Sequence, residues 1–275
     1  MVTQDSKGQA FRDLHKRDAA FIIPNPWDEG TARLLAHLNF EALATTSAGY
    51  AFSTGKLDNT VSRDQMMVHL ATIVSATDLP VSADLENGFG DDPESVAETI
   101  RLAAAAGVVG GSIEDATTRP SDPLYERDLA VERIRAAAEA ARSLPFPFTL
   151  TARAENFLVG RPDLKDAIKR LQAYQDAGAD VLYAPGIAEK DEIATVVTAV
   201  DRPVNVVMGL QGSRLSLTEL SEIGVKRVSV GSALSRAALG AFLRAANEMR
   251  EHGTFGFADD AVSYRDVSDM LSPPS

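Results

Sequence analysis

Short apolar runs alternate with longer segments of helical spacing along most of the chain. The apolar runs are continuous, which predicts strands that are buried on both faces, as in a parallel sheet. These strands are predicted at 20–23, 42–46, 81–85, 108–113, 148–152, 181–184, 203–207 and 225–230. Between them, apolar residues recur at the spacing of one helix face. Helices are predicted at 31–38, 63–76, 93–106, 128–142, 162–177, 189–199, 218–223 and 233–251.

Eight strand–helix units follow one another without a linker or low-complexity tract. Such a series favours a closed (β/α)8 barrel, because an open doubly wound sheet would have fewer units and less apolar edge strands. We therefore predict one α/β domain over 1–275, a single TIM-type barrel with a polar N-terminal helix at 1–18 and a mixed tail at 254–275. The aromatic residues of the tail predict contact with its own barrel or with a neighbouring subunit.

Polar residues follow the predicted strands, and in a parallel barrel these positions converge on one pocket. Asp84 and Glu86 are two residues apart, so strand alternation predicts that both point to the same side. Two crowded carboxylates repel each other unless a cation or a proton lies between them. The other polar residues at strand ends are Asn25, Asp28, Thr46, Ser47, Gly49, Glu114, Asp115, Arg153, Glu155, Tyr183, Asn205 and Ser232.

Carboxylates, hydroxyls and amides dominate this set, which matches Mg²⁺ or Mn²⁺ better than Zn²⁺. The histidines, His15, His37, His69 and His252, all fall in predicted outer helices, and we interpret them as surface or interface residues.

Arg153 is the one cation that directly follows a predicted strand. Its planar fork suits a carboxylate or phosphate, although an internal salt bridge to Glu114 or Glu155 is the alternative. The segment 46–49 offers hydroxyls and backbone amides that could hold a second anionic group, or it is an ordinary turn.

Composition narrows the function further. The net charge of −12 argues against nucleic-acid binding, because no basic surplus is present to neutralise phosphates. The chain has no cysteine, which fits a reducing compartment. Neither a membrane-length apolar run nor a signal peptide is recognisable, so we predict a cytoplasmic protein without a membrane partner.

The segments 45–49, 82–90, 112–115 and 151–155, together with Asp58, resemble the successive motifs of the isocitrate lyase and phosphoenolpyruvate mutase superfamily. The resemblance extends from about residue 21 to the end of the last helix. It implies a barrel whose last helix is exchanged between neighbouring subunits of a homo-oligomer, a dimer or more usually a tetramer. It also implies a Mg²⁺ site that binds small 2-oxo or enol carboxylates.

Carried over by position, the resemblance implies roles for individual residues. Asp84 resembles the main metal-anchoring acid, with Glu86 and Glu114 acting mostly through metal-bound water. Arg153 resembles the arginine that pairs with substrate, and Asp58 matches an acid on a mobile gate. The segment that holds the substrate's carboxylate or phosphonate corresponds to Ser47, Ala48 and Gly49. From their places at predicted strand ends we also expect Thr46 and Asn205 to bind substrate and Tyr183 to be catalytic.

Two departures bear on the activity. The lyases carry a Lys-Lys-Cys-Gly-His type loop whose cysteine is the general acid, whereas this chain has a different loop at 116–125 and no cysteine. The mutases favour aspartate where this chain has Glu86, and tryptophan where it has Ala44 or Thr45. The feature that lyases and mutases share, and that neither departure affects, is a metal that polarises a 2-oxo acid and stabilises an enolate.

We therefore expect a Mg²⁺-dependent carbon–carbon lyase or decarboxylase acting on a small 2-oxo or 2-hydroxy dicarboxylate of the oxaloacetate type. The alternatives are phosphonopyruvate mutase or hydrolase chemistry, and a non-catalytic 2-oxo acid binding protein. The proton donor stays open among Tyr183, Glu155, Ser121 and a metal-bound water. The loop at 117–128, with two prolines and no apolar spacing, predicts a lid.

Overall fold

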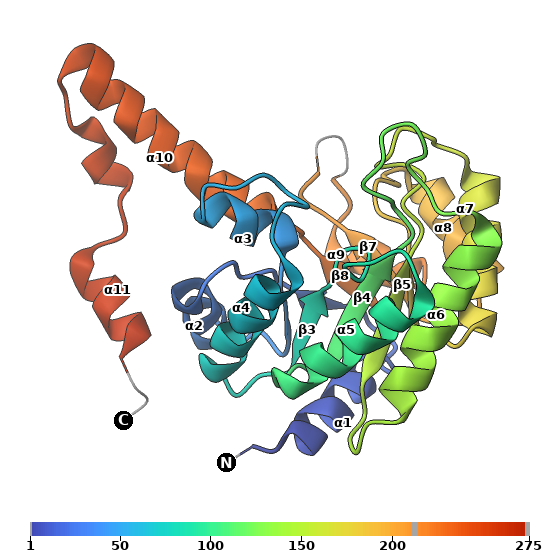
Figure 1. Ribbon diagram of the computed structural model, residues 1–275. Coiled ribbons are helices and arrows are strands. Elements are labelled where there is room, and N and C mark those ends of the chain that lie inside the picture. Colours follow the sequence, from blue (N-terminus) through green and yellow to red (C-terminus); the bar gives the residue numbers. More distant parts are fainter. Residues whose placement is uncertain (1, 211–213, 273–275) are drawn as a thin grey trace.

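The computed structural model describes residues 2–210 and 214–272. Its eight strands form one parallel sheet in the order β1-β8-β7-β6-β5-β4-β3-β2 (Figure 1). Across the remaining gap, the Ala44 N–H donates to the Pro24 carbonyl oxygen at 3.0 Å, so the barrel is nearly closed. The predicted (β/α)8 fold is confirmed. The strands are β1 Phe21–Ile23, β2 Leu43–Ala44, β3 Val81–Asp84, β4 Gly110–Glu114, β5 Thr149–Arg153, β6 Val181–Tyr183, β7 Val204–Val207 and β8 Arg227–Ser229.

Helices surround the barrel and begin at recognisable caps. Ser62 caps α4 through the Gln65 N–H, as its sequence position predicts, and Pro93 begins α5 directly after the Asp92 cap. The helices are α1 Gln4–Leu14, α2 Glu29–His37, α3 Ser47–Ser53, α4 Arg63–Ser75, α5 Pro93–Ala105, α6 Arg127–Arg142, α7 Leu164–Asp176, α8 Lys190–Ala199, α9 Leu217–Glu222, α10 Ala233–His252 and α11 Tyr264–Leu271.

Helix α3 was not predicted, because we interpreted the segment 46–49 either as an irregular cradle for an anion or as an ordinary turn. Thr46 is its N-cap, and the Thr46 hydroxyl accepts a hydrogen bond from the Gly49 N–H at 3.2 Å. The helix has only seven residues, too few for a clear apolar repeat. Its first turn therefore lies where the sequence suggested only an irregular cradle.

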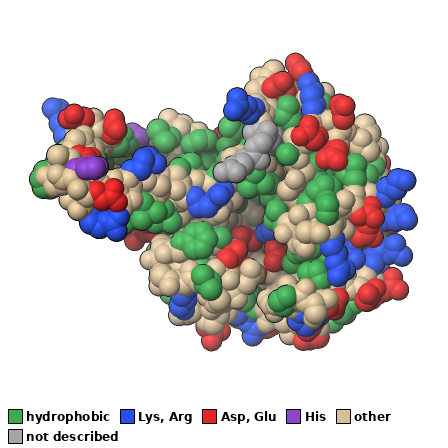
Figure 2. All heavy atoms as spheres, turned by 90° about the horizontal axis from the view of Figure 1, so that it is seen from above, with side chains coloured by type: hydrophobic (Ala, Val, Ile, Leu, Met, Phe, Trp, Pro, Cys, Tyr) green, Lys and Arg blue, Asp and Glu red, His purple; other side chains and the backbone are tan. Residues whose placement is uncertain are grey.

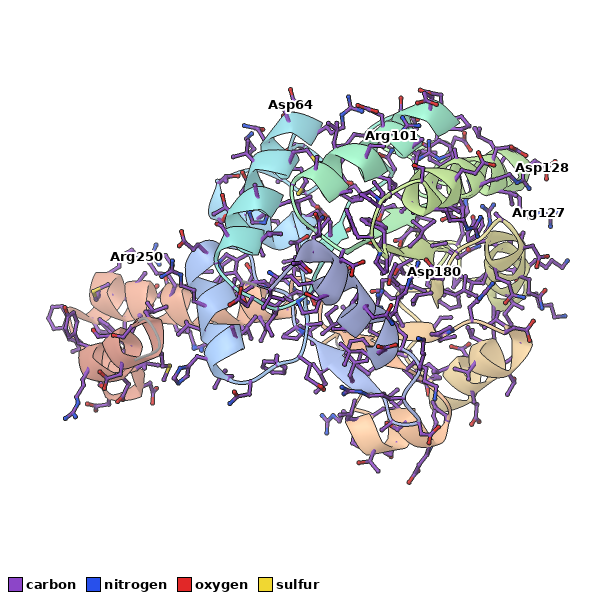
Figure 3. The ribbon with its side chains drawn as sticks, turned by 90° about the horizontal axis from the view of Figure 1, so that it is seen from below. Asp64, Arg101, Arg127, Asp128, Asp180 and Arg250 are labelled. Carbon is purple, nitrogen blue, oxygen red and sulfur yellow. The ribbon has the colours of Figure 1, made fainter. Side chains whose placement is uncertain are left out.

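Helix α1 closes the N-terminal end of the barrel, as the view from below shows (Figure 3). Phe11 and Leu14 of α1 pack with Phe21 and Ile23 of β1 in a buried apolar cluster. Gly110 permits this approach, because a Cβ there would lie 2.8 Å from a ring atom of Phe11. The functional cavity consequently lies at the opposite end.

Two of the histidines correct our expectation of surface positions. His15 is buried between the rings of Phe11 and Phe21, and burial, with the charge of Arg227 adding to it, lowers its pKa to about 3. His69 is buried against Tyr50, with ring centroids 3.8 Å apart, and burial lowers its pKa to about 4. Both imidazoles act as neutral packing groups, because burial disfavours their charged form.

Helix α10 extends away from the barrel, and the tail returns beside it (Figures 1 and 2). The returning helix α11 contacts α2, so this part of the tail meets its own barrel. Phe255 and Tyr264 nevertheless stay 67% and 91% exposed. In the described part of the chain, no helix is long and apolar enough to cross a bilayer.

Candidate active site

A cavity of about 180 Å³ lies at the carboxyl ends of the strands, and the view onto this end shows a hollow beside acidic side chains (Figure 2). Most of the predicted site residues converge on it. Those that line the cavity are Asn25, Thr46, Ser47, Ala48, Asp58, Asp84, Arg153, Tyr183, Asn205 and Ser232. Gly49 lies behind this lining, where it packs against Thr46 and Trp27.

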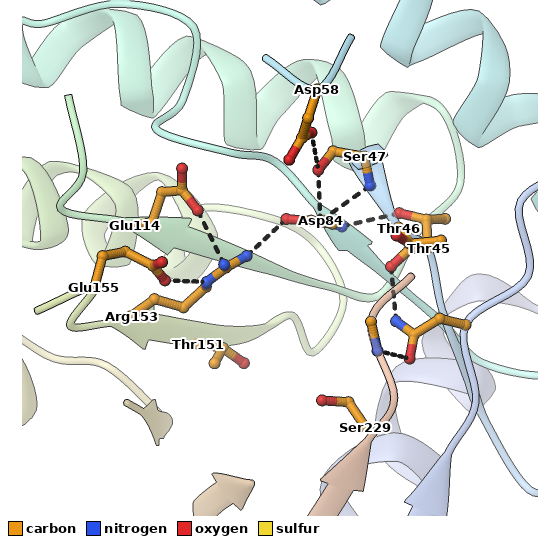
Figure 4. Close-up of polar contacts among 12 residues, drawn as sticks. Thr45, Thr46, Ser47, Asp58, Asp84, Glu114, Thr151, Arg153, Glu155 and Ser229 are labelled. Atoms are coloured by element: carbon orange, nitrogen blue, oxygen red, sulfur yellow. Dashed lines mark hydrogen bonds and ion pairs between the residues drawn. The ribbon is translucent and has the colours of Figure 1, made fainter. Parts of the chain in front are cut away.

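Arg153 lies at the centre of the carboxylates (Figure 4). Its Nη1 contacts Asp84 Oδ1 at 2.9 Å, its Nη2 contacts Glu114 Oε2 at 3.1 Å, and its Nε contacts Glu155 Oε1 at 2.7 Å. The guanidinium carbon also lies 5.3 Å from the centroid of the Tyr183 ring. The internal salt bridge that we held as the alternative is therefore present, and it includes Asp84.

Burial and mutual charge shift the pKa values of this cluster. Burial alone would lower the pKa of Arg153, but Glu155, Glu114 and Asp84 together raise it well above its usual range. Burial raises the pKa of Glu114 and of Glu155 despite the opposing charge of Arg153. Burial likewise raises the pKa of Tyr183. The phenol therefore stays protonated near neutral pH and can donate a hydrogen bond.

Ser47 connects Asp84 to Asp58. Its backbone N–H and its hydroxyl both lie within hydrogen-bond distance of Asp84 Oδ2, at 3.0 and 2.9 Å, and its hydroxyl is 3.3 Å from Asp58 Oδ1. The Ser47 donors are thus engaged by Asp84, whereas the sequence suggested that they face a ligand. Burial, followed by the Asp84 charge, raises the pKa of Asp58.

Glu86 lies next to Asp58 and Asp84, but strand alternation, which we expected to set the direction of its side chain, does not do so. Strand β3 ends at Asp84, and Glu86 adopts a φ of 49°, so a turn and not strand alternation sets its direction. It borders a separate hollow beside Asn59 and Asn87. Its Oε1 is buried without a hydrogen-bond partner, and burial, with the charges of Asp84 and Asp58, raises its pKa to about 8.

These acids suit a hard divalent cation. Asp58, Asp84 and Glu86 provide oxygen ligands, and the unpartnered Glu86 oxygen is a buried acceptor that a cation would satisfy. No three His, Cys, Asp or Glu side chains of the described residues converge closely enough to form a complete metal site. The missing ligands would have to be water or substrate, which is how proteins usually bind Mg²⁺.

The Glu86→Gln variant should be more stable than the wild type in alkaline, metal-free buffer. Because the folded-state pKa is raised to about 8, ionisation of Glu86 costs stability as the pH rises from about 4.5 to 8. Glutamine imitates the protonated acid, so we expect a gain of about 1–3 kcal/mol at pH 9 and little change at pH 5. Urea unfolding at both pH values measures it. An equal gain at both pH values, or one shared by the exposed Glu94→Gln control, would contradict the assignment.

Asp115, which also follows β4, points away from the cavity. Its Oδ1 accepts from the Glu155 N–H at 2.8 Å, and its Oδ2 accepts from Tyr174 at 2.5 Å and from Arg170 at 3.1 Å. It therefore holds the backbone of the Glu155 loop against α7. Nothing in the local sequence distinguishes Asp115 from Glu114, because the direction of each side chain depends on where the strand ends.

Arg133 is a positioning residue that the sequence did not reveal. It is fully buried, and it donates to the carbonyl oxygens of Gly90 and Asp91 at 2.6 Å each. Tyr125 lies under its guanidinium and donates to Asp91 Oδ1 at 2.5 Å. These contacts fix the segment that follows Glu86. A further contact, the ion pair between Arg119 of the predicted lid and Asp91, joins the lid to the same segment.

Arg227 is a second guanidinium on the cavity wall, and it was missed as well. It is the first residue of β8, and we did not consider charged residues within this strand. The available signal was the polar alternation of Arg227 and Ser229 within a run that we treated as continuously apolar.

An eight-stranded parallel barrel with an acidic cavity at the carboxyl ends of its strands has the architecture of a barrel enzyme. A family model described as phosphoenolpyruvate phosphomutase matches residues 11–250. The chain therefore belongs to the isocitrate lyase and phosphoenolpyruvate mutase superfamily, as its motifs indicate.

Individual relatives agree with this placement. A Burkholderia cenocepacia structure described only as a lyase/mutase is 68% identical, with a TM-score of 0.96, and the match covers 98% of this chain and 97% of that one. The 2-methylisocitrate lyase of Salmonella typhimurium is 32% identical over 67% of this chain and 64% of its own length. A structure of oxaloacetate acetylhydrolase with its product oxalate is 26% identical, with a TM-score of 0.87, and covers 98% and 95%.

Proposed function

We propose that this protein is a divalent-metal-dependent lyase or decarboxylase that breaks a carbon–carbon bond in a small 2-oxo or 2-hydroxy dicarboxylate of the oxaloacetate type. The observation that carries this proposal is the placement of Asp58 and Asp84 on a cavity that also contains arginine, with the buried, unpartnered Glu86 oxygen beside them. Relatives named 2-methylisocitrate lyase and oxaloacetate acetylhydrolase support the same substrate class.

The acidic, basic and phenolic side chains of the site would each have a separate role in the reaction. Asp84 and Glu86, with Asp58 nearby, would hold Mg²⁺ or Mn²⁺, which supplies Lewis-acid polarisation of the 2-oxo group. Arg153 offers positive charge at the point where an enolate forms. Tyr183 keeps its proton because burial raises its pKa, so it can donate to the developing negative charge or to the product carbon.

Decarboxylation fits this site because it needs little beyond stabilisation of the enolate left when CO₂ departs. The chain has no cysteine, so the acid that the resemblance assigns to the true lyases has no counterpart here. Protonation of the enolate carbon then falls to Tyr183, whose raised pKa keeps its proton in place near neutral pH.

The family model's description favours a second candidate, phosphonopyruvate mutase or hydrolase chemistry. This reaction needs a polar group above the substrate, but the loop at 116–125 contributes nothing to the lining of the main cavity as described. We therefore rank it below carbon–carbon cleavage, and above a binding protein without turnover.

Product analysis separates the three functions. Metal-free protein is incubated with oxaloacetate or phosphonopyruvate, with and without Mg²⁺, and products are followed by proton and phosphorus NMR. Metal-dependent release of pyruvate from oxaloacetate above the spontaneous rate supports the decarboxylase, and oxalate with acetate would indicate hydrolytic cleavage. Turnover of phosphonopyruvate alone would establish the second candidate. Metal-dependent binding of 2-oxo acids without any turnover would leave the binding protein.

We also propose that the protein forms a homo-oligomer through α10. Leu239, Phe242 and Leu243 lie at helical spacing on α10 and are 40%, 67% and 57% exposed. An apolar stripe of this kind on a projecting helix is typical of a subunit contact. Light scattering after size-exclusion chromatography should give a dimer or tetramer, and Phe242→Glu should shift it towards monomer while Lys169→Glu on α7 does not. A monomeric wild type would refute this proposal.

A further inference from the structure

Arg227 extends across the interior of the barrel. It lies on β8 in register with Phe21 of β1 and Asn205 of β7. Its Nε donates to Asn205 Oδ1 at 2.8 Å, and its Nη2 donates to Thr151 Oγ1 on β5 at 3.0 Å. The residue is only 5% exposed. These two contacts hold the guanidinium at a fixed place on the cavity wall.

The positive charge of Arg227 has no partner. Within residues 2–210 and 214–272, Arg227 makes no ion pair, and its Nη1 is buried without a hydrogen-bond acceptor. Arg153 differs, since each of its three nitrogens contacts a carboxylate. A buried cation without an acid is costly, so its retention calls for an anion that arrives from outside the chain.

Free donors accompany Arg227 in the same cavity. Ser82 and Ser112 line it, and their hydroxyls make no hydrogen bond to other described residues. Asp58 and Asp84 lie at the rim formed by the β3 end and the segment after α3, whereas Arg227 lies on the β8 side. One side of the cavity is therefore acidic and suited to a metal. The other side is cationic and carries free hydrogen-bond donors.

We propose that Arg227, assisted by the Ser82 and Ser112 hydroxyls, binds the terminal carboxylate of a dicarboxylate substrate and thereby selects dianionic over monoanionic 2-oxo acids. This inference rests on the proposed function, because it takes the 2-oxo end of the substrate to lie at the acidic side. The guanidinium replaces its missing partner with the substrate carboxylate, and the interaction is a charge-assisted hydrogen bond in a site of low dielectric.

The test compares matched ligands that differ in one terminal group. 2-Oxoglutarate and 2-oxopentanoate have the same chain, as do oxaloacetate and 2-oxobutanoate, but the second member of each pair ends in a methyl group. Calorimetric titration in the presence of Mg²⁺ should show the dicarboxylate of at least one pair binding wild-type protein about 10- to 100-fold more tightly. In Arg227→Met this ratio should fall to near one with the monocarboxylate affinity unchanged, and Arg227→Lys should restore part of it.

Lys226→Met is the matched control. Lys226 is the neighbouring residue, and its Nζ donates to the Arg17 and Asp18 carbonyl oxygens on the exposed surface. Removing that charge should leave the ratio unchanged. If Arg227→Met does not fold, the wild-type ratio and the Arg227→Lys variant still decide the question.

The outcomes separate this inference from the proposed function. A wild-type ratio near one in both pairs, or a preference that survives Arg227→Met, would overturn the assignment of Arg227 even if oxaloacetate is turned over. Failure of every 2-oxo acid to bind the wild type would refute the proposed function and this inference with it. Loss of affinity for both members of a pair in folded Arg227→Met would show a general structural role and would also overturn it.

Discussion

Replacing Asp84 with alanine is expected to reduce metal-dependent turnover by about 10³-fold or more, because a metal site that loses its anchoring acid loses the electrostatic stabilisation of the enolate. Asp84 is the acid that contacts both Ser47, at the start of α3, and Arg153, at the end of β5. Its Oδ2 accepts from Ser47, and its Oδ1 accepts from Arg153 at 2.9 Å. The substitution would therefore remove the proposed metal ligand, and it would also free the Ser47 donors and one nitrogen of Arg153.

Asp84→Asn separates these effects. The amide keeps the size of the side chain and one acceptor oxygen, so the fold should survive while cation affinity falls. Mg²⁺ titration by calorimetry and steady-state kinetics would be measured for both variants. Asp176→Asn, an exposed acid in the last turn of α7, is the charge-matched control. Wild-type turnover by a folded Asp84→Ala protein would show that the acidic group has been misread.

Replacing Arg153 with methionine is expected to lower the free energy of unfolding by about 3–5 kcal/mol at pH 8, since buried carboxylates lose their common cation. Glu155 is the most buried of the three partners, with a side chain 4% exposed, and it cannot turn to solvent without moving its loop. Turnover should be lost as well, because Arg153 is the cation nearest to Asp84. Urea unfolding with parallel kinetics measures both effects.

The loss of unfolding free energy in Arg153→Met should depend on pH in a defined direction. Burial raises the folded-state pKa of Glu114 and Glu155, so the folded protein binds protons that the unfolded chain releases, and stability falls as pH rises through this window. Arg153 opposes both shifts. Removing Arg153 should therefore lower stability most at alkaline pH and least at acidic pH, where protonation removes the charge of the two acids.

A second substitution tests the mechanism of that loss. Glu155→Gln in the Arg153→Met background should recover part of the stability, because it removes one of the unpaired buried charges. The same Glu155→Gln change alone should destabilise, since it breaks the 2.7 Å contact with Arg153. A pH-independent deficit, or no recovery in the double variant, would show that lost packing dominates.

The amino-acid sequence by itself determined the architecture and the identity of most cavity residues. Continuous apolar runs separated by helical spacing specify a parallel barrel, and such a barrel brings strand ends together. For that reason Asp84, Arg153 and Tyr183 could be placed on one cavity from their positions at strand ends, and Asn205, which lies inside β7, lines the same cavity. These features depend on local pattern, which sequence carries directly.

The direction of individual side chains was decided only by the tertiary structure. Glu86 and Asp115 sit beside cavity acids in the sequence, yet a positive φ turns one towards a separate hollow and a hydrogen-bond network draws the other towards α7. Helix α3 depends on its Thr46 cap and on packing, since seven residues carry too little periodicity to predict it.

Which charged side chains pair across the barrel was also decided only by the tertiary structure. The partners of Arg153 come from β3, β4 and the end of β5, which are 69, 39 and two residues away in sequence, and no local pattern specifies which carboxylate each nitrogen contacts. Arg227 was not singled out from the sequence, but β8 turns it into the interior, where nothing in the described chain neutralises it. Sequence fixes which charged groups a barrel contains, whereas the closure of the sheet decides which of them meet, because pairing depends on distances between strands that are remote along the chain.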